Sequence, residues 1–230
     1  EEDPVPPSFV LPPQQRLEPN FDPDELLGIS HGYAGQVALL DFCLGFLLDA
    51  FWSGPHAAST TLMATSPRGY PLGEHLRVGR CDDALYTELI GVPWLIHRAD
   101  ESLWSSRDHR LAQPADVYAT LLDAMGCNQA SPASWGQSVF GAVGDQPSLN
   151  CAVSCQDGQR AIRTAAWFLR QSGVEEMELF VKPDDRWEVN EISDRCHETV
   201  EALSEYLDRF QTAAQANDRS LLPPLDAELA

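Results

Sequence analysis

The stretch TTLMATSPRGYPLGEHLRVGR, residues 60–80, decides how the rest of the chain is interpreted. It begins with β-branched and apolar residues, 60–65, which is the composition of a short buried strand. It continues as a polar loop, punctuated by Gly and Pro, that holds Arg68, Glu74, His75, Arg77 and Arg80. An α/β sheet carries its chemistry at the carboxyl ends of its strands, so this loop is the first candidate site.

The sequence on both sides of this stretch predicts α/β units. Asp22 and Pro23 form a helix start, and a longer helix is expected over about residues 30–52, where apolar residues recur every three or four positions and predict one buried helix face. That face holds Val37, Leu40 and Leu47 among others. A buried strand over residues 92–97 and a helix over residues 114–125 follow. We expect an α/β portion over residues 24–149.

Beyond residue 149 the pattern changes to strands. Runs at 152–154, 161–170 and 177–182 are separated by turns at 157–158 and 172–173, which predicts an antiparallel sheet of about three strands. A helix with one apolar face follows over 196–216. We therefore expect a C-terminal antiparallel subdomain over residues 150–216. A Pro-rich arm at 1–23 and a polar tail at 217–230 complete the predicted organisation.

Composition excludes several classes of partner. The 230 residues include 35 acidic and 15 basic side chains, and the net charge of −20 argues against nucleic acid and anionic membrane surfaces. No apolar run approaches the ~18 residues of a membrane span, so we expect no membrane partner. The six cysteines have no zinc-site spacing and slightly favour a reducing, cytoplasmic location. The chain begins with Glu1 instead of Met, which we interpret as a sign of a processed or truncated domain.

Several stretches, in order, resemble the sulfatase family of the alkaline-phosphatase-like superfamily. Residues 72–75, LGEH, are similar to the Leu-Gly-(Glu/Asp)-His that follows the family's metal loop, and residues 92–96, VPWLI, are similar to its Val-Pro-Leu-Ile strand. Residues 116–123, DVYATLLD, resemble the family helix that follows. The resemblance covers residues 24–215, the central to C-terminal portion. It implies part of a sulfatase-like sheet with flanking helices, then a small antiparallel sheet and a terminal helix.

The chain departs from the family at the residues that carry catalysis. The family's Ser-Asp-His-Gly loop ligates a divalent cation, whereas this chain has Ser66-Pro67-Arg68-Gly69. Proline offers no ligand and arginine keeps its positive charge, so we predict no metal site and no cofactor. A cation such as Ca²⁺ would bind only if other residues completed the site. None of the six cysteines lies in the family's Cys/Ser-x-Pro-x-Arg nucleophile motif, which belongs to the N-terminal half of the family domain.

Two candidate sites remain in the loop, each with an alternative. By resemblance, His75 would donate to a sulfate-ester oxygen, and the alternative is an orienting or buried structural histidine. Arg68, Arg77 and Arg80 are candidates for an anion site, because guanidinium groups bind sulfate, phosphate and carboxylate oxygens bidentately. The alternative for the arginines is salt bridging to nearby acids: Glu74, Asp82 and Asp83.

These observations predict a sulfatase-like domain that lacks sulfuric ester hydrolase activity by itself, a pseudoenzyme or fragment. Its candidate partners are an anionic small molecule, such as a sulfate or phosphate ester, and a protein, including the missing N-terminal half. One alternative is an active sulfatase or phosphatase when an upstream segment or partner chain supplies nucleophile and ligands. The other is a structural interaction module in which the arm at residues 1–23 docks a partner.

Overall fold

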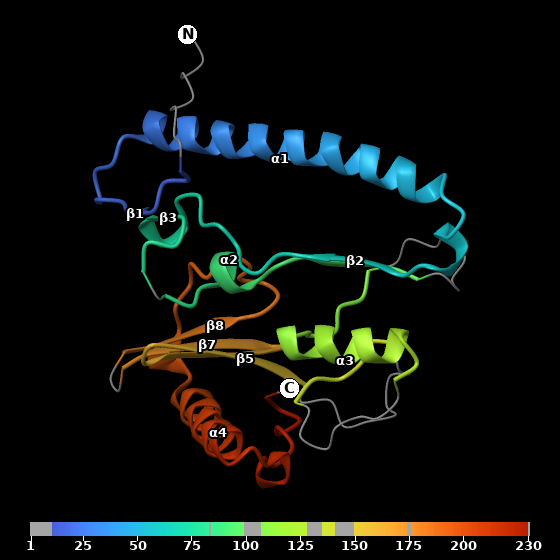
Figure 1. Ribbon diagram of the computed structural model, residues 1–230. Coiled ribbons are helices and arrows are strands. Elements are labelled where there is room, and N and C mark those ends of the chain that lie inside the picture. The colour runs from blue at the N-terminus through green and yellow to red at the C-terminus, as the bar shows by residue number, and fades with distance from the viewer. Residues whose placement is uncertain are drawn as a thin grey trace. The chain divides into compact units, whose positions relative to one another are not determined.

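Two compact units make up the chain in its computed structural model, which describes residues 11–82, 84–98, 107–127, 135–140, 150–173 and 176–229 (Figure 1). The first unit comprises Glu1–Asp82 and Glu88–Ser105, and the second comprises Asp83–Thr87 and Ser106–Ala230. The first therefore contains the long helix and the candidate loop. The second contains the C-terminal antiparallel sheet together with the short segment just before Glu88.

The first unit is dominated by one continuous helix, α1 (Pro23–Trp52), which is 30 residues long. The carboxylate of Asp22 accepts a hydrogen bond from the backbone N–H of Asp24, and Pro23 occupies the first turn, where its missing N–H costs nothing. The predicted helix start is confirmed. No break separates this start from the apolar segment that follows it, because nothing between them caps or kinks the helix.

Short antiparallel pairs form the remaining regular structure of the first unit. β2 (Leu62–Thr65) pairs with β4 (Trp94–His97), so that Leu62 faces His97 and Thr65 faces Trp94. β1 (Gln15–Arg16) pairs with β3 (Arg77–Val78), which places part of the Pro-rich stretch against the candidate loop. α2 (Thr87–Ile90) is a single helical turn. Single 3₁₀ turns occur in both units, at Ala57–Ser59, Glu74–Leu76, Ser193–Arg195 and Arg219–Leu221.

Helix α1 is held near its two ends and exposed between them. Close to the first end, the ring of Tyr33 stacks on that of Tyr70, with centroids 5.6 Å apart. At the second end, the rings of Trp52 and His97 meet edge to face at 4.5 Å. Every residue from 33 to 43 is exposed to solvent in the described structure.

The buried face predicted for α1 is therefore wrong in this structure. Val37, Leu40 and Leu47 are 46%, 66% and 60% exposed. Apolar periodicity reports which face a helix is able to bury, but burial also needs a surface to pack against. The described part of the chain supplies that surface only near the two ends of α1.

The length and composition of α1 also meet the requirement for a membrane span, and the expectation that no apolar run is long enough is therefore wrong. Its apolar stretch is interrupted by only two charged residues, Asp41 and Asp49, and was missed because it is not an unbroken apolar run. None of the most apolar part of the helix is buried. The match of α1 to a membrane span rests on its length and composition only.

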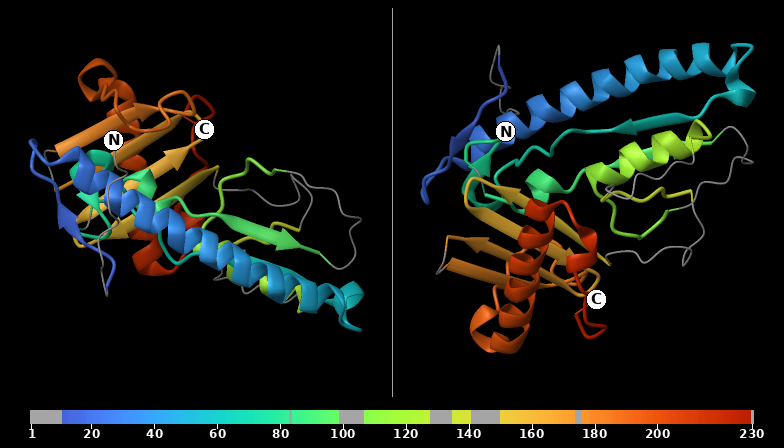
Figure 2. Two further views of the ribbon diagram at one scale, coloured as in Figure 1. Left: turned by 90° about the horizontal axis from the view of Figure 1, so that it is seen from above. Right: turned by 60° about the horizontal axis from the view of Figure 1, so that its bottom comes forward.

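The second unit is built on a four-stranded antiparallel meander (Figure 2). Its strands are β5 (Cys151–Gln156), β6 (Gln159–Thr164), β7 (Trp167–Ser172) and β8 (Glu176–Val181). The predicted antiparallel sheet is confirmed, with one strand more than expected, because the run at 161–170 is divided between β6 and β7. The unit also contains the helix α3 (Pro114–Ala124).

The core of this unit lies between the sheet and the terminal helix α4 (His197–Ala216). Leu203 and Leu207 of α4 are fully buried against Ile162, Leu169 and Leu179 of the sheet. The apolar face predicted for this helix is thus confirmed. Cys151 lies in the same core, where burial raises the pKa of its thiol to about 11.

A buried ion pair fixes the segment after β8. The Lys182 ammonium lies 2.7 Å from the Glu188 carboxylate, and the two side chains are only 4% and 1% exposed. Lys182 also donates to the backbone carbonyl of Asp185 at 2.7 Å. Glu188 accepts hydrogen bonds from both the backbone N–H and the hydroxyl of Thr87. Every strong polar group in this cluster therefore has partners, which is the condition for burying charge without a large penalty.

Removing one partner of this pair should strongly destabilise the second unit. We expect Glu188→Gln to lower its free energy of unfolding by about 3–5 kcal/mol, because the Lys182 charge is left buried without compensation. The double variant Lys182→Met/Glu188→Gln should recover part of that loss. Denaturant unfolding followed by tryptophan fluorescence gives the comparison. The exposed pair Arg209–Glu205 is the control, and Glu205→Gln should cost less than about 1 kcal/mol; equal losses at the two sites would contradict the prediction.

Candidate functional site

The candidate loop starts where β2 ends and turns at once toward α2. The Ser66 hydroxyl donates to the backbone carbonyl of Arg68 at 2.6 Å, which closes a tight turn around Pro67. The backbone N–H of Gly69 then donates to the carbonyl of Leu89 at 2.7 Å. A Cβ at Gly69 would overlap the carbonyl oxygen of Glu88, so only glycine permits this approach.

The second half of the loop contains consecutive left-handed residues. Gly73 has φ 112°, and a Cβ there would lie 2.5 Å from a methyl carbon of Leu26 on α1. His75 and Leu76 follow with φ 49° and 57°, a conformation that costs a non-glycine residue roughly 1–2 kcal/mol. The Glu74 carboxylate accepts from the backbone N–H of Leu72 at 2.5 Å and supports this turn. The surrounding contacts thus hold His75 in a specific, strained backbone position.

His75 is engaged by a carboxylate. Its Nδ1 lies 2.7 Å from Oε1 of Glu88 on α2, and the two side chains are 17% and 13% exposed. A carboxylate on one ring nitrogen fixes the tautomer and the orientation of an imidazole. This contact suits an orienting or structural histidine and also a positioned acid, so the role of His75 stays a prediction. Glu88 was not singled out from the sequence, because no local pattern links it to a histidine 13 positions earlier.

The three arginines differ in their surroundings. The Nε of Arg77 lies 3.0 Å from the Asp82 carboxylate, and its Nη1 donates to the backbone carbonyl of His75 at 2.6 Å. Arg16 reaches the same carboxylate at 2.6 Å. The Arg68 and Arg80 side chains are exposed. The structure therefore ties Arg77 to an acid, as the salt-bridge alternative predicted, and the anion-binding role of the set stays a prediction.

Two contacts join the loop region to the N-terminal stretch of the chain and could not be predicted from the sequence. Arg16 meets Asp82 from 66 positions away, and the Tyr70 hydroxyl donates to the carbonyl of Pro13 at 2.7 Å. Burial raises the pKa of Tyr70, and the nearby Arg68 charge partly offsets that rise. Both contacts depend on the pairing of β1 with β3, and no local sequence motif predicts that pairing.

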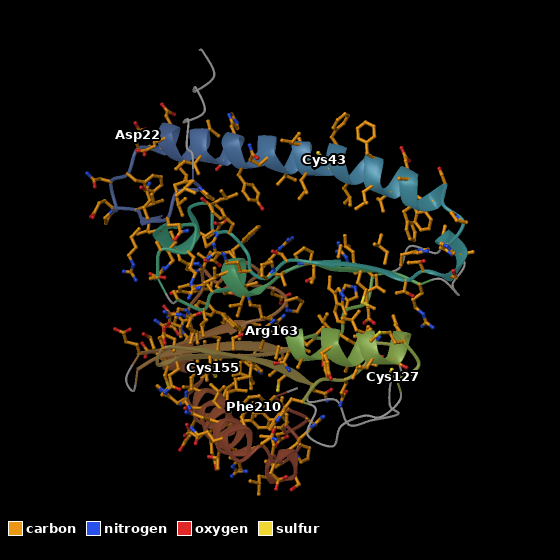
Figure 3. All side chains as sticks on the ribbon, in the orientation of Figure 1. Asp22, Cys43, Cys127, Cys155, Arg163 and Phe210 are labelled. Atoms are coloured by element: carbon orange, nitrogen blue, oxygen red, sulfur yellow. The ribbon has the colours of Figure 1, made fainter. Side chains whose placement is uncertain are left out.

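The loop offers little to a cation. Pro67 and Arg68 occupy its first turn, and both are exposed. Within the described ranges, no group of three or more His, Cys, Asp or Glu side chains is arranged to hold a metal ion. All six cysteines are free thiols. Figure 3 labels three of them: Cys43, Cys127 and Cys155. The contacts that these loop residues make in the structure are hydrogen bonds and ion pairs.

Comparison with solved structures identifies the fold. A 2-O GAG sulfatase matches with a TM-score of 0.69 and 17% identity, over 90% of this chain and 47% of that chain. A Bacteroides thetaiotaomicron protein of glycosaminoglycan metabolism matches at 0.67 with 19% identity, over 90% and 47%. A phosphonate monoester hydrolase of Agrobacterium radiobacter matches at 0.65 with 16% identity, over 86% and 43%. No protein-family profile and no curated protein sequence matches the chain.

The chain thus has part of the α/β fold of these solved sulfatase structures, as its motifs predicted. It spans less than half the length of these neighbours, which is consistent with a central to C-terminal portion of the sulfatase fold. Identities below 20% establish the fold and leave activity to be decided by the site residues.

The close approach at Gly69 yields a direct test of the loop. Gly69→Ala must push the loop away from α2, so we expect the first unit to lose about 2 kcal/mol or more of stability. Gly45→Ala is the matched control, because Gly45 lies in α1 with nothing within 4 Å of a new Cβ, and it should stabilise by about 0.5–1 kcal/mol. Thermal unfolding by circular dichroism measures both. Equal effects at the two glycines would show that the loop does not depend on this contact.

Proposed function

We propose that this chain is a sulfatase-like portion that acts by binding and does not hydrolyse sulfate esters by itself. The observation that carries the proposal is the content of the loop after β2. The turn where sulfatase-type chemistry would place metal ligands holds Pro67 and an exposed Arg68. Neither residue can bind a cation, and the Cys/Ser-x-Pro-x-Arg nucleophile motif surrounds none of the cysteines.

The electrostatics of the loop support the same conclusion. A hard cation such as Ca²⁺ needs six or more oxygen ligands, mostly carboxylates. Of the carboxylates in the loop region, Asp82 is paired with Arg16 and Arg77, and Glu88 with His75. Glu74 accepts the backbone N–H of Leu72. The described acids near the loop are thus engaged in holding its conformation.

The corresponding assay uses 4-nitrophenyl sulfate and 4-nitrophenyl phosphate with Ca²⁺, Mg²⁺, Mn²⁺ or Zn²⁺. We expect no turnover above the blank with any of the four ions, because the loop supplies neither ligands nor nucleophile. Metal-dependent turnover that disappears in His75→Ala would overturn the proposal. His31→Ala, an exposed histidine of α1, is the control for non-specific effects of removing an imidazole.

A second candidate function is anion binding at the exposed arginines. Arg68 and Arg80 present exposed side chains on a protein whose net charge is −20, so an anion could approach only where positive charge is local. The ligand class would be a sulfate, phosphate or carboxylate group.

Titration with inorganic sulfate and inorganic phosphate, followed by calorimetry, tests this candidate. Loss of one charge-assisted hydrogen bond corresponds to about a tenfold weaker affinity, so Arg68→Ser should weaken binding by about that factor. Arg209→Ser on α4 is the matched control and should leave affinity unchanged. Binding that is absent in the unaltered chain, or equally weak in both variants, would rule the anion site out.

A further inference from the structure

Helix α1 presents an extensive apolar surface that the described chain leaves uncovered. Nine of its large apolar side chains are between 42% and 66% exposed. They occur on every side of the helix: Leu27, Tyr33, Val37, Leu39, Leu40, Phe42, Phe46, Leu47 and Trp52. We call them the α1 surface. A helix that is apolar all round is normally enclosed in a protein core or in lipid.

The size of this surface suits a stable protein interface. At roughly 100 Å² of exposed area for each large side chain, the nine residues present about 900 Å². One side of a standard protein interface buries about 800 Å². Isolated exposed apolar side chains need no explanation, but a continuous patch of this size marks a site of contact.

The path of the chain argues against a membrane-spanning α1. Leu26, near the start of the helix, contacts the candidate loop at Gly73, and Trp52, at its end, contacts His97 of β4. The chain therefore runs out along α1 and returns along β2, as the views in Figures 1 and 2 agree. If α1 crossed a bilayer, the chain returning along β2 would have to cross it again as an extended strand with one open edge. Lipid does not tolerate such backbone.

The two-stranded sheet of β2 and β4, which follows α1 in the chain, has an open edge at β2 in the described structure. β2 pairs with β4 along all four of its residues, and in the described structure no strand occupies its other edge. A two-stranded sheet is at best marginally stable in water without a further strand or a packed helix. Leu95 of β4 is 64% exposed, so this pair also leaves apolar surface uncovered. An occupant that adds a strand to β2 would satisfy the backbone groups at this edge.

We propose that the α1 surface and the open edge of β2 form the docking site for the complementary part of a sulfatase-like domain, carried on the same gene product. This occupant supplies a strand beside β2 and neutral, apolar side chains around α1. The inference rests on the sulfatase-like fold and does not depend on whether the chain hydrolyses esters. More than half of each neighbouring sulfatase-like chain has no counterpart here, which is sufficient polypeptide for this role.

The charges on α1 favour this occupant over a second copy of the chain. Asp41 lies near the middle of the exposed segment. Two antiparallel α1 helices packed together would bring their Asp41 carboxylates close to each other in an apolar interface, where unpaired charge is costly. Beyond its first turn α1 carries only two charged side chains, Asp41 and Asp49, so this part of the helix suits a largely neutral partner in which a polar group can be placed opposite Asp41.

A natural cysteine reports on the burial of α1. Figure 3 labels Cys43 on α1, Cys127 after α3 and Cys155 on β5, and all three are exposed. The experiment compares N-ethylmaleimide labelling of each cysteine, by mass spectrometry, in the 230-residue chain and in the gene product extended by its upstream coding sequence. We expect Cys43 to label about 100-fold more slowly in the extended protein, because it would react only after local opening. Cys127 and Cys155 should keep their rates.

Two substitutions separate docking from general unfolding. In the extended protein, Leu40→Glu should restore fast labelling of Cys43, and Val189→Glu, at an apolar position of the second unit that is at least as exposed as Leu40, should not. Cys151 is buried and should stay unlabelled in both variants. If Leu40→Glu exposes Cys151, the milder Leu40→Ala replaces it and should raise Cys43 labelling several-fold with Cys151 still protected.

Four results would overturn the proposal. They are equal Cys43 labelling rates in the two proteins, a mature gene product that is processed to begin at Glu1, protection of Cys43 in the short chain that rises with protein concentration, and protection of Cys43 only with phosphatidylcholine vesicles. The third result would indicate a second copy and the fourth a lipid surface. Metal-dependent turnover of 4-nitrophenyl sulfate by the 230-residue chain alone would overturn the non-hydrolytic proposal and leave this one standing, so the two fail separately.

Discussion

The close backbone approach at Gly69 is the constraint on which the candidate site depends. The N–H of Gly69 donates to the carbonyl of Leu89, and the absence of a side chain lets the loop lie directly on α2. That contact sets Glu88 within reach of His75. The His75–Glu88 interaction then offsets the energetic cost of the left-handed backbone at His75. A single hydrogen bond and a missing Cβ thus organise the loop that follows β2.

The motifs of the loop resemble those of the sulfatase family in their order, whereas two side chains in its first turn differ from the family pattern. The strand, the turn at Gly69 and the Leu-Gly-Glu-His segment occur in the family order. The positions expected to bind a cation instead hold Pro67 and Arg68, and the acids around them are paired with His75, Arg16 and Arg77. Function at such a site follows from the side chains present, since one fold supports many chemistries and also none.

The two units differ in how completely they bury their apolar surface. In the second, α4 covers the sheet, and the Lys182–Glu188 pair has a hydrogen-bond partner for each charge. In the first, α1 is held near its ends and exposed between them. A helix of 30 residues is about 45 Å long, more than the short strands β2 and β4 can cover. The uncovered surface follows from this mismatch in length.

The sequence by itself determined the local elements. Asp22 and Pro23 start α1, apolar periodicity defines α4, and turns at Asp157-Gly158 and Ser172-Gly173 separate the strands of the C-terminal sheet. The order of its motifs also indicated the sulfatase-like fold. These features depend on residues close together in the chain, where capping, turn chemistry and periodicity act directly.

Only the tertiary structure decided which groups meet. The pairing of His75 with Glu88, the convergence of Arg16 and Arg77 on Asp82, and the contact of Glu188 with Thr87 join residues up to 101 positions apart. The exposure of α1 could not be predicted from the sequence either, because an apolar pattern shows only that a helix is able to be buried. Whether that capacity is used depends on which other surfaces the folded chain brings against it.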